Sequence, residues 1–155
     1  MLNKINSKII IIFTLVLTLL VSVSFISEKV YAEESKIQII AGITPLKTFI
    51  DKVGGEKVDT SVMIPPGYSP ANYAPSPSEL KKLSDADYYF TFQMPAEKSN
   101  ILPKVNKFNE NINLIKLDKI TSEKYEPRKF SNGGIDPHIW MSPKRVEYII
   151  EIIKN

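Results

Sequence analysis

His138, the only histidine of the 155-residue chain, lies in the segment D-P-H-I-W-M-S-P that spans residues 136–143. In this segment Asp136 can orient the imidazole ring or cap a turn, and Trp140 can shield one side of the ring from water. An imidazole whose second nitrogen is fixed by a partner, in a partly dry environment, is a better metal ligand. The segment therefore favours a metal-binding histidine. The alternative is a hydrogen-bonded structural histidine beside an aspartate-capped turn and a core tryptophan.

The rest of the composition argues against catalysis. With one histidine and no cysteine, neither a multi-histidine zinc site nor a histidine-based catalytic triad can be completed within one chain. Asp85 and Asp87 resemble paired carboxylates, but at the edge of a strand we expect them to cap and to solubilise. The aromatic run 88–92 lacks interleaved lysine or arginine, which is typical of a core strand rather than of a surface that stacks nucleic-acid bases. We expect no enzyme and no nucleic-acid partner.

The N-terminus has the features of an export signal. Two lysines precede an apolar run from Ile9 to Ile26, and Val30-Tyr31-Ala32 places small residues at the spacing of a cleavage site. We predict a signal peptide over 1–32 and an exported protein, extracellular or surface-associated, or periplasmic if the organism has an outer membrane. A retained membrane anchor is the alternative, because the run approaches the roughly 18 residues that cross a bilayer.

The cysteine count and the charge refine this picture. A chain without cysteine has no disulfide and no acceptor for a lipid at the processing site, so we expect a protein that is not a lipoprotein. The net charge of +3 comes partly from lysines of the predicted signal, and the mature protein is nearly neutral. The residues after Ala32 suffice for one compact domain and are too few for two.

Those residues alternate short β-rich runs with helical patterns, which predicts an α/β fold with a four-stranded, mainly parallel sheet flanked by helices. Strands are expected over 37–41, 58–64, 86–92 and 112–117. Helices are expected over 45–53, over 79–84 with Ser78 as cap, and from Pro143 onward. Glu79 and its neighbouring lysines are expected on a solvated helix face, and 119–134 is expected to be a long surface loop.

The final helix has an apolar stripe that reaches the end of the chain. Val146, Ile149, Ile150 and Ile153 recur at helical spacing, and no glycine follows to end the helix. We therefore divide the mature chain into one α/β lobe over 33–142 and the start of a longer helix over 143–155.

Three segments resemble a known family: P-P-G-Y-S-P-A-N-Y-A-P-S-P-S-E-L at 65–80, K-K-L-S-D-A-D-Y-Y-F at 81–90, and the segment around His138. They are similar to the solute-binding proteins of zinc and manganese ABC importers, a group that includes streptococcal lipoprotein adhesins. The resemblance runs from about Ile37 to the end of the chain. It implies two α/β lobes joined by one long helix, of which this chain is the N-terminal lobe.

The resemblance also implies a metal site between the lobes. Two histidines from the N-terminal lobe, with a histidine and a carboxylate from the C-terminal lobe, hold the ion. His138 matches the second histidine, whereas Ala71 stands where the family commonly has the first. Asn72 follows and could contribute weakly through its amide oxygen, a ligand that suits hard cations better than zinc. The departure indicates either a sub-type with other ligands or a receptor that has lost transition-metal binding.

We therefore expect the extracytoplasmic zinc- or manganese-binding component of an ABC import system, incomplete as it stands, with the ion as cargo rather than catalyst. Its implied partners are a membrane permease and a C-terminal lobe that is supplied elsewhere or missing. A homodimer that shares one ion between two copies of His138 is also open. The alternatives are a surface adhesion or interaction protein and an inactive truncated product.

Overall fold

The computed structural model describes residues 7–26 and 35–155, which fall into two units, Met1–Glu34 and Ser35–Asn155. Within the first unit, α1 (Ser7–Ile26) covers the apolar run, and its described side chains are mostly exposed. In the described part of the chain, no helix combines the length and the apolar character needed to cross a membrane. The predicted cleavage site after Ala32 lies outside the described residues.

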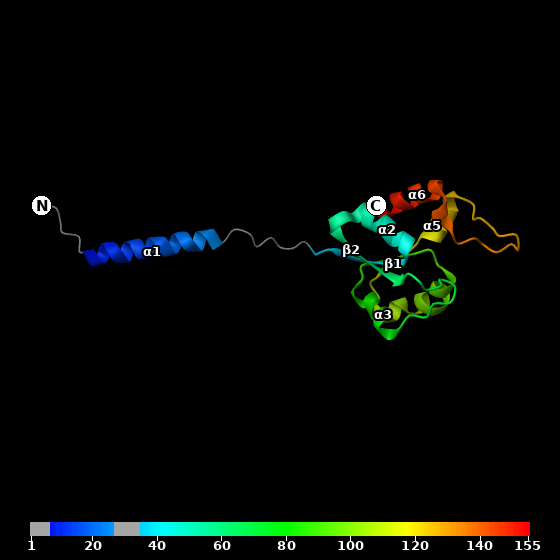
Figure 1. Ribbon diagram of the computed structural model, residues 1–155, viewed down its shortest axis with the longest axis horizontal. Helices are drawn as coiled ribbons and strands as arrows, with labels where there is room; N and C mark the ends of the chain where they lie inside the picture. The colour runs from blue at the N-terminus through cyan, green and yellow to red at the C-terminus, as the bar shows by residue number, and fades with distance from the viewer. Residues whose placement is uncertain (1–6, 27–34) are drawn as a thin grey trace. The chain divides into compact units, whose positions relative to one another are not determined.

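The second unit is built on a parallel sheet of four strands in the order β2-β1-β3-β4 (Figure 1). The strands are β1 (Ile37–Ile43), β2 (Val58–Ile64), β3 (Tyr88–Thr91) and β4 (Asn113–Lys116). Ile40 of β1 pairs with Ser61 of β2 and with Tyr89 of β3, and all three strand pairings are parallel. The predicted fold class is confirmed. All carboxyl ends of the strands therefore meet at one edge of the sheet.

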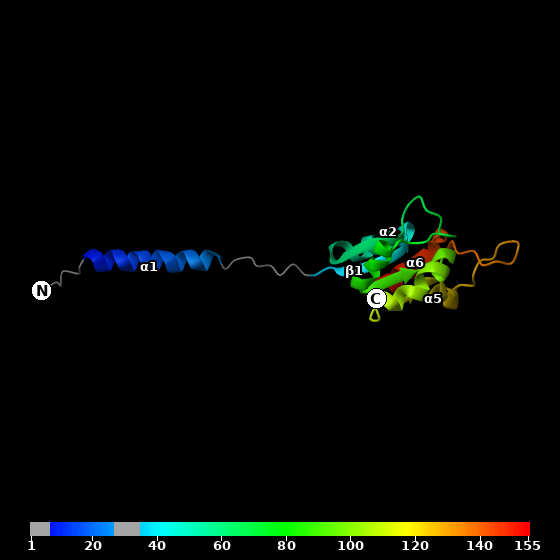
Figure 2. The same cartoon turned by 90° about the horizontal axis from the view of Figure 1, so that it is seen from below.

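Helices cover both faces of this sheet. Figure 1 shows α2 (Thr44–Gly54) and α6 (Pro143–Lys154) on one side and α3 (Pro77–Lys81) on the other. A π-helical turn (Glu97–Ile101) and α4 (Val105–Phe108) connect β3 to β4. α5 (Leu117–Lys124) follows β4 and lies beside α6 (Figure 2). The connections between successive strands are thus crossovers, as parallel strands require.

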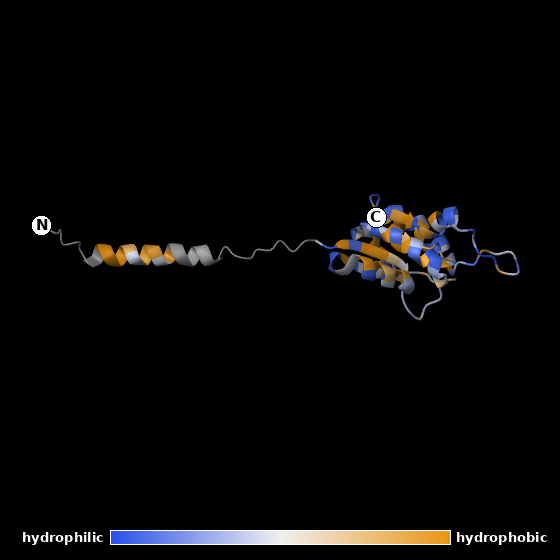
Figure 3. Ribbon diagram, turned by 90° about the horizontal axis from the view of Figure 1, so that it is seen from above, coloured by the Kyte–Doolittle hydropathy of each residue, from blue (hydrophilic) through white to orange (hydrophobic). Residues whose placement is uncertain are grey.

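Local sequence explains the main elements. In β1 five consecutive residues, 39–43, are buried, as expected of a central strand covered on both faces. α2 begins with Pro45 in its first turn, where a missing N–H costs nothing, and its last residue is followed by Gly55, whose φ of 56° is left-handed. In Figure 3 the strands carry the hydrophobic colour, while the helices mix hydrophobic and hydrophilic residues.

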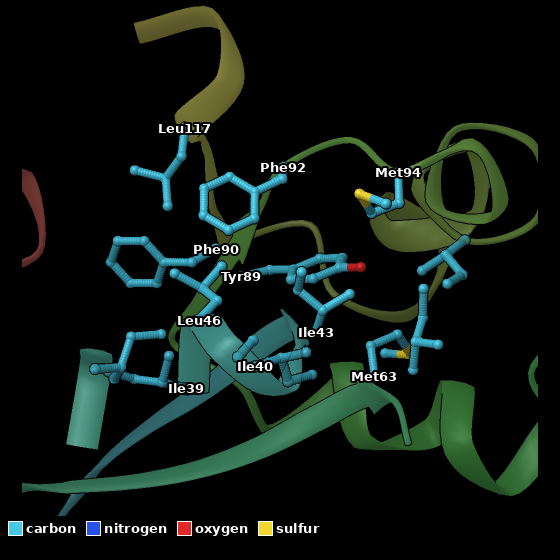
Figure 4. Close-up of a cluster of buried hydrophobic side chains, with 14 of the residues drawn as sticks. Ile39, Ile40, Ile43, Leu46, Met63, Tyr89, Phe90, Phe92, Met94 and Leu117 are labelled. Carbon is cyan, nitrogen blue, oxygen red and sulfur yellow. The ribbon is translucent and has the colours of Figure 1, made fainter. Parts of the chain in front are cut away.

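One continuous core fills the space between the layers. Its largest fully buried side chains include Tyr89 of β3, Phe92 directly after β3, Ile40 of β1 and Leu46 of α2 (Figure 4). α6 contributes Ile149, and Leu117 anchors the start of α5. The aromatic run 88–92 is thus a core strand, as its composition indicated, with only Tyr88 at the surface.

Three expectations about local structure were wrong. Residues 119–124 are helical rather than part of a loop, because Leu117 and Thr121 bury one short face of α5 that two positions could not reveal as a period. The cap of α3 is Ser76 rather than Ser78, because Pro77 takes the first helical position. Glu79 is half-buried rather than solvated, since its carboxylate closes a capping box with Ser76.

Candidate metal-binding hollow

An open hollow of about 610 Å³ lies where the chain leaves the carboxyl end of β3. We call it the hollow. Four segments form it: the loop 69–71, the turn 92–95 after β3, one face of α5, and the stretch 127–139. Ala71 and His138 both line it, so folding brings together the two positions that the resemblance singled out. Ligands of parallel α/β sheets bind at this edge.

His138 has a defined ring orientation. Its Nδ1 lies 2.7 Å from Oδ1 of Asp136, and its backbone N–H donates to the same oxygen at 3.0 Å. Both bonds, the backbone bond first, hold the pKa of Asp136 below its usual value. The carboxylate can only accept, so the proton of this bond lies on Nδ1, and in the neutral imidazole Nε2 is then the nitrogen with a lone pair. Asp136 thus does both things that the sequence left open, because one carboxylate oxygen contacts the ring and also caps the turn through the His138 amide.

The surroundings of His138 are partly apolar. The Trp140 ring lies 5.1 Å from the imidazole, and Trp140 stacks on Phe92 of the core with the ring centroids 5.3 Å apart. The next residue, Ile139, is buried and fixes the short 3₁₀ turn that follows. The His138 side chain remains 52% exposed, whereas that of Asp136 is only 15% exposed. The imidazole thus stands on a rigid support with one side open.

The loop that carries Ala71 is braced from both ends. The Ala96 N–H donates to the Pro70 carbonyl at 3.0 Å, and the Asn100 side-chain amide donates to the Tyr73 carbonyl at 2.7 Å. The Tyr73 hydroxyl donates to Oε1 of Glu79 at 2.5 Å. Position 71 therefore has a defined place at the hollow even though alanine offers no donor there. Asn72 is exposed and is not among the residues that line the hollow.

The same loop perturbs two ionisable groups. Burial, with the Glu79 hydrogen bond second, raises the pKa of Tyr73 to about 12. The hydrogen bond from Tyr73, followed by those from Ser76, lowers the pKa of Glu79 to about 2. Both shifts favour the hydrogen-bonded form, a neutral phenol that donates to a charged carboxylate.

Two residues that sequence patterns did not reveal also line the hollow. Gln93 has a φ of 52° and donates through Nε2 to both oxygens of Asp118, at 2.8 and 2.9 Å. The Gln93 backbone N–H donates to Oγ1 of Thr91 at 2.7 Å. A signal existed for both residues, because each directly follows the carboxyl end of a predicted strand, Gln93 after 86–92 and Asp118 after 112–117.

The lobe alone supplies a partial donor set. Among residues 35–155 that the structure describes, no group of three or more histidine, aspartate or glutamate side chains is placed to hold a metal ion. His138 offers one nitrogen, and the carboxylate of Asp136 is already hydrogen-bonded to the imidazole. Transition-metal sites need three or four protein ligands, so this hollow resembles one half of a site.

A parallel α/β unit that carries an oriented imidazole at the carboxyl edge of its sheet belongs to the class of ligand-binding lobes. The family model described as ZnuA, zinc-uptake complex component A periplasmic, matches residues 39–155. The chain belongs to this family, which confirms the resemblance. The periplasmic description of the family agrees with the predicted export.

Individual relatives give the same result. The zinc-binding protein AdcA of Streptococcus pyogenes is 26% identical over 79% of this chain and 27% of that protein. The manganese-binding lipoprotein MntA of Halalkalibacterium halodurans is 23% identical over 77% of this chain and 38% of that protein. A crystal structure of ZnuA superposes with a TM-score of 0.67 at 31% identity, covering 77% of this chain and 45% of that one.

Two differences from these relatives are plain. The chain spans from about a quarter to less than half of their length. MntA is named a lipoprotein, whereas this sequence contains no cysteine.

Proposed function

We propose that this chain is the N-terminal lobe of an extracytoplasmic receptor that binds zinc or manganese for an ABC importer, with His138 as its metal ligand. The observation that carries the proposal is the hollow itself, which is lined by an imidazole that Asp136 orients and by the loop of Ala71. The ion is cargo that is bound and released unchanged, so the receptor performs no catalysis. Among the relatives, AdcA is named a zinc-binding protein and MntA a manganese-binding lipoprotein.

The proposal assigns a part to each segment. Residues 1–32 form the signal peptide, 33–142 form the lobe, and 143–155 begin the helix that leads to a second lobe. α6 suits this role because its apolar face packs into the core, where Ile149 is fully buried. Because the sequence contains no cysteine, the exported protein carries no lipid on a cysteine at its processing site.

The missing ligands must come from partners of this lobe. Receptors of this kind close two lobes around their ligand, and a membrane permease recognises the closed form. Phe130 and Ile135 line the hollow and are exposed, as expected of a surface that contacts a second lobe. The same exposed residues favour surface adhesion as the second candidate function, because they could contact another protein without any metal.

Calorimetric titration of the purified chain with zinc and with manganese tests the proposal. We expect weak binding, because one imidazole is far from a complete site, and we expect His138→Ala to abolish it. Asn72→Ala serves as the matched control in the neighbouring loop and should change the affinity little. Equal binding by the wild-type chain and His138→Ala would refute His138 as a ligand and favour the adhesive role.

A further inference from the structure

A buried carboxyl group lies behind one wall of the hollow. Glu97 begins the π-helical turn and is 0% exposed. Its Oε1 accepts a hydrogen bond from the Tyr89 hydroxyl at 2.7 Å, and its Oε2 accepts one from the Met94 backbone N–H at 2.8 Å. A buried carboxyl group is tolerated only when such partners compensate its lost hydration. Its two oxygens therefore connect the core of β3 to the turn 92–95.

That turn is the part of the chain that lines the hollow. Gln93, at the centre of the turn, has a left-handed φ. A residue other than glycine adopts such a backbone angle only when its surroundings enforce it. The enforcing bonds are those of two neighbouring amides, from Gln93 to Thr91 and from Met94 to Glu97. With its backbone fixed in this way, Gln93 donates hydrogen bonds from its side-chain amide to Asp118, which also lines the hollow.

The backbone next to Glu97 is linked to the loop of position 71. Ala96, the residue before Glu97, donates its N–H to the carbonyl of Pro70, next to Ala71. On its other side the Glu97 carboxyl group fills the space above Gly42, where any Cβ atom would overlap it. Glu97 is thus enclosed by β1, by β3 and by the turn (Figure 4 shows Tyr89 and Met94 of this region).

We infer that Glu97 is a positioning residue of the hollow, which holds the turn 92–95 and the loop of position 71 in the arrangement that a cation meets. The inference rests on the proposed function for its cation and on the geometry above for everything else. Nothing about Glu97 places it in contact with the ion, so its effect on binding must pass through the backbone of Met94 and Ala96 and through Gln93.

Electrostatics adds a signature that a purely structural residue would lack. Burial is the largest influence and raises the pKa of Glu97, while hydrogen bonds from Thr91, Tyr89 and Met94 act in the opposite direction. The negative charge of Asp118 raises the pKa of Glu97 further. Tyr89 and Asp118 are the ionisable groups that act on this carboxyl group. The backbone signals of the turn should therefore respond to pH through Glu97.

Two substitutions separate geometry from charge. Glu97→Gln keeps both hydrogen bonds, because its amide oxygen can accept from Met94 and its NH₂ can donate to the Tyr89 oxygen, but it cannot titrate. Glu97→Ala removes both bonds. Val105→Ala, a truncation of a fully buried residue in the following helix, is the control for a general loss of stability. Each variant is made in the 155-residue chain.

The first measurement is amide hydrogen exchange at Met94 and Ala96, which requires no metal. We expect Glu97→Ala to accelerate exchange at both amides by at least about tenfold beyond Val105→Ala, and Glu97→Gln to restore the wild-type rates. In the wild-type chain the amide shifts of Gln93 and Met94 should follow pH, and in Glu97→Gln they should not. Exchange in Glu97→Ala that matches Val105→Ala would overturn the inference.

Zinc titration of the same variants then tests the link to binding. Weaker binding by Glu97→Ala, with near wild-type binding by Glu97→Gln, supports the positioning role. Equal zinc affinity for Glu97→Ala and Val105→Ala contradicts it. If the exchange results hold but the wild-type chain binds neither zinc nor manganese, the proposed function fails while the positioning of the hollow by Glu97 stands.

Discussion

At the scale of residues, the candidate site is defined by a local arrangement around one imidazole. Asp136 and His138 are two positions apart, and the intervening Pro137 restricts the backbone so that one carboxylate oxygen meets both the ring and the amide of His138. This arrangement orients the ring of His138, which lines the hollow, through residues that are close in the sequence. What the lobe lacks is a second nitrogen ligand opposite it, at Ala71.

Ala71→His should supply that ligand. Because the loop is already braced at Pro70 and Tyr73, an imidazole at position 71 needs no refolding to face His138. We expect zinc affinity to rise by more than about tenfold, equivalent to about 1.4 kcal/mol, and manganese affinity to rise less. Asn72→His, one position further and outside the lining of the hollow, is the matched control for calorimetry. An equal gain from both substitutions would contradict the assignment of position 71.

Asp136→Ala should weaken zinc binding by about 10- to 100-fold, the usual effect of losing the partner that orients a ligand imidazole. The measurement is best made in the Ala71→His variant, where the affinity is highest. Asp136→Asn retains an oxygen that can accept from Nδ1, so its loss should be smaller. If Asp136→Ala binds zinc as well as Asp136→Asn, the orientation of the ring does not matter for binding.

At the scale of elements, the hollow is shaped by short helices and by loops that hydrogen bonds hold in place, rather than by long helices. α3 has only five residues, yet its capping box joins Ser76 and Glu79, and the same glutamate receives the Tyr73 hydroxyl from the preceding loop. α5 is held to α6 by Lys124, whose Nζ lies 4.1 Å from the centre of the Tyr148 ring. Both short helices thus depend on contacts beyond their own turns.

The Glu79 interactions should make stability depend on pH at the acid end. A carboxylate whose pKa is lowered on folding stabilises the fold above its ordinary value of 4.5 and loses that contribution as pH falls toward about 2. Urea unfolding midpoints should therefore fall more steeply over this range for the wild-type chain than for Glu79→Gln. Glu123→Gln, which changes an exposed glutamate of α5, should follow the wild-type curve. Parallel curves for wild type and Glu79→Gln would rule out this contribution.

At the scale of the whole molecule, one parallel sheet gathers the carboxyl ends of its strands at the edge where the hollow opens. The lobe is stabilised by a single core shared between the sheet and its helices, and it accounts for less than half of the length of its relatives. Its proposed site is correspondingly partial. A second lobe would add ligands without any change in this core.

Ile149→Ala tests how strongly α6 is bound to that core. Ile149 is 0% exposed, so its truncation should lower the free energy of unfolding by about 2–5 kcal/mol. Ile150, its neighbour in the same helix, is 38% exposed, and Ile150→Ala should cost about 1 kcal/mol or less. Urea denaturation followed by circular dichroism measures both. Similar losses for the two variants would mean that α6 does not pack as described.

Local sequence was sufficient to predict the α/β class, the parallel sheet and several element bounds. Val58–Ile64 and the helix from Pro143 were predicted correctly because β-branched runs, prolines and glycines act on the backbone within a few residues. The partnership of Asp136 with His138 was predictable for the same reason, since it spans one proline. The family resemblance likewise depended on contiguous motifs.

Only the tertiary structure decided the features that depend on contacts between distant segments. Ala71 and His138 share one hollow because different crossovers of the sheet return to the same edge, and no local pattern encodes that meeting. Glu97 looks like a surface residue in the sequence, yet packing of β1 against β3 buries it beside Gly42 and gives it its partners. Local propensity acts along the chain, whereas burial and hydrogen bonding across the core are decided only when the strands come together.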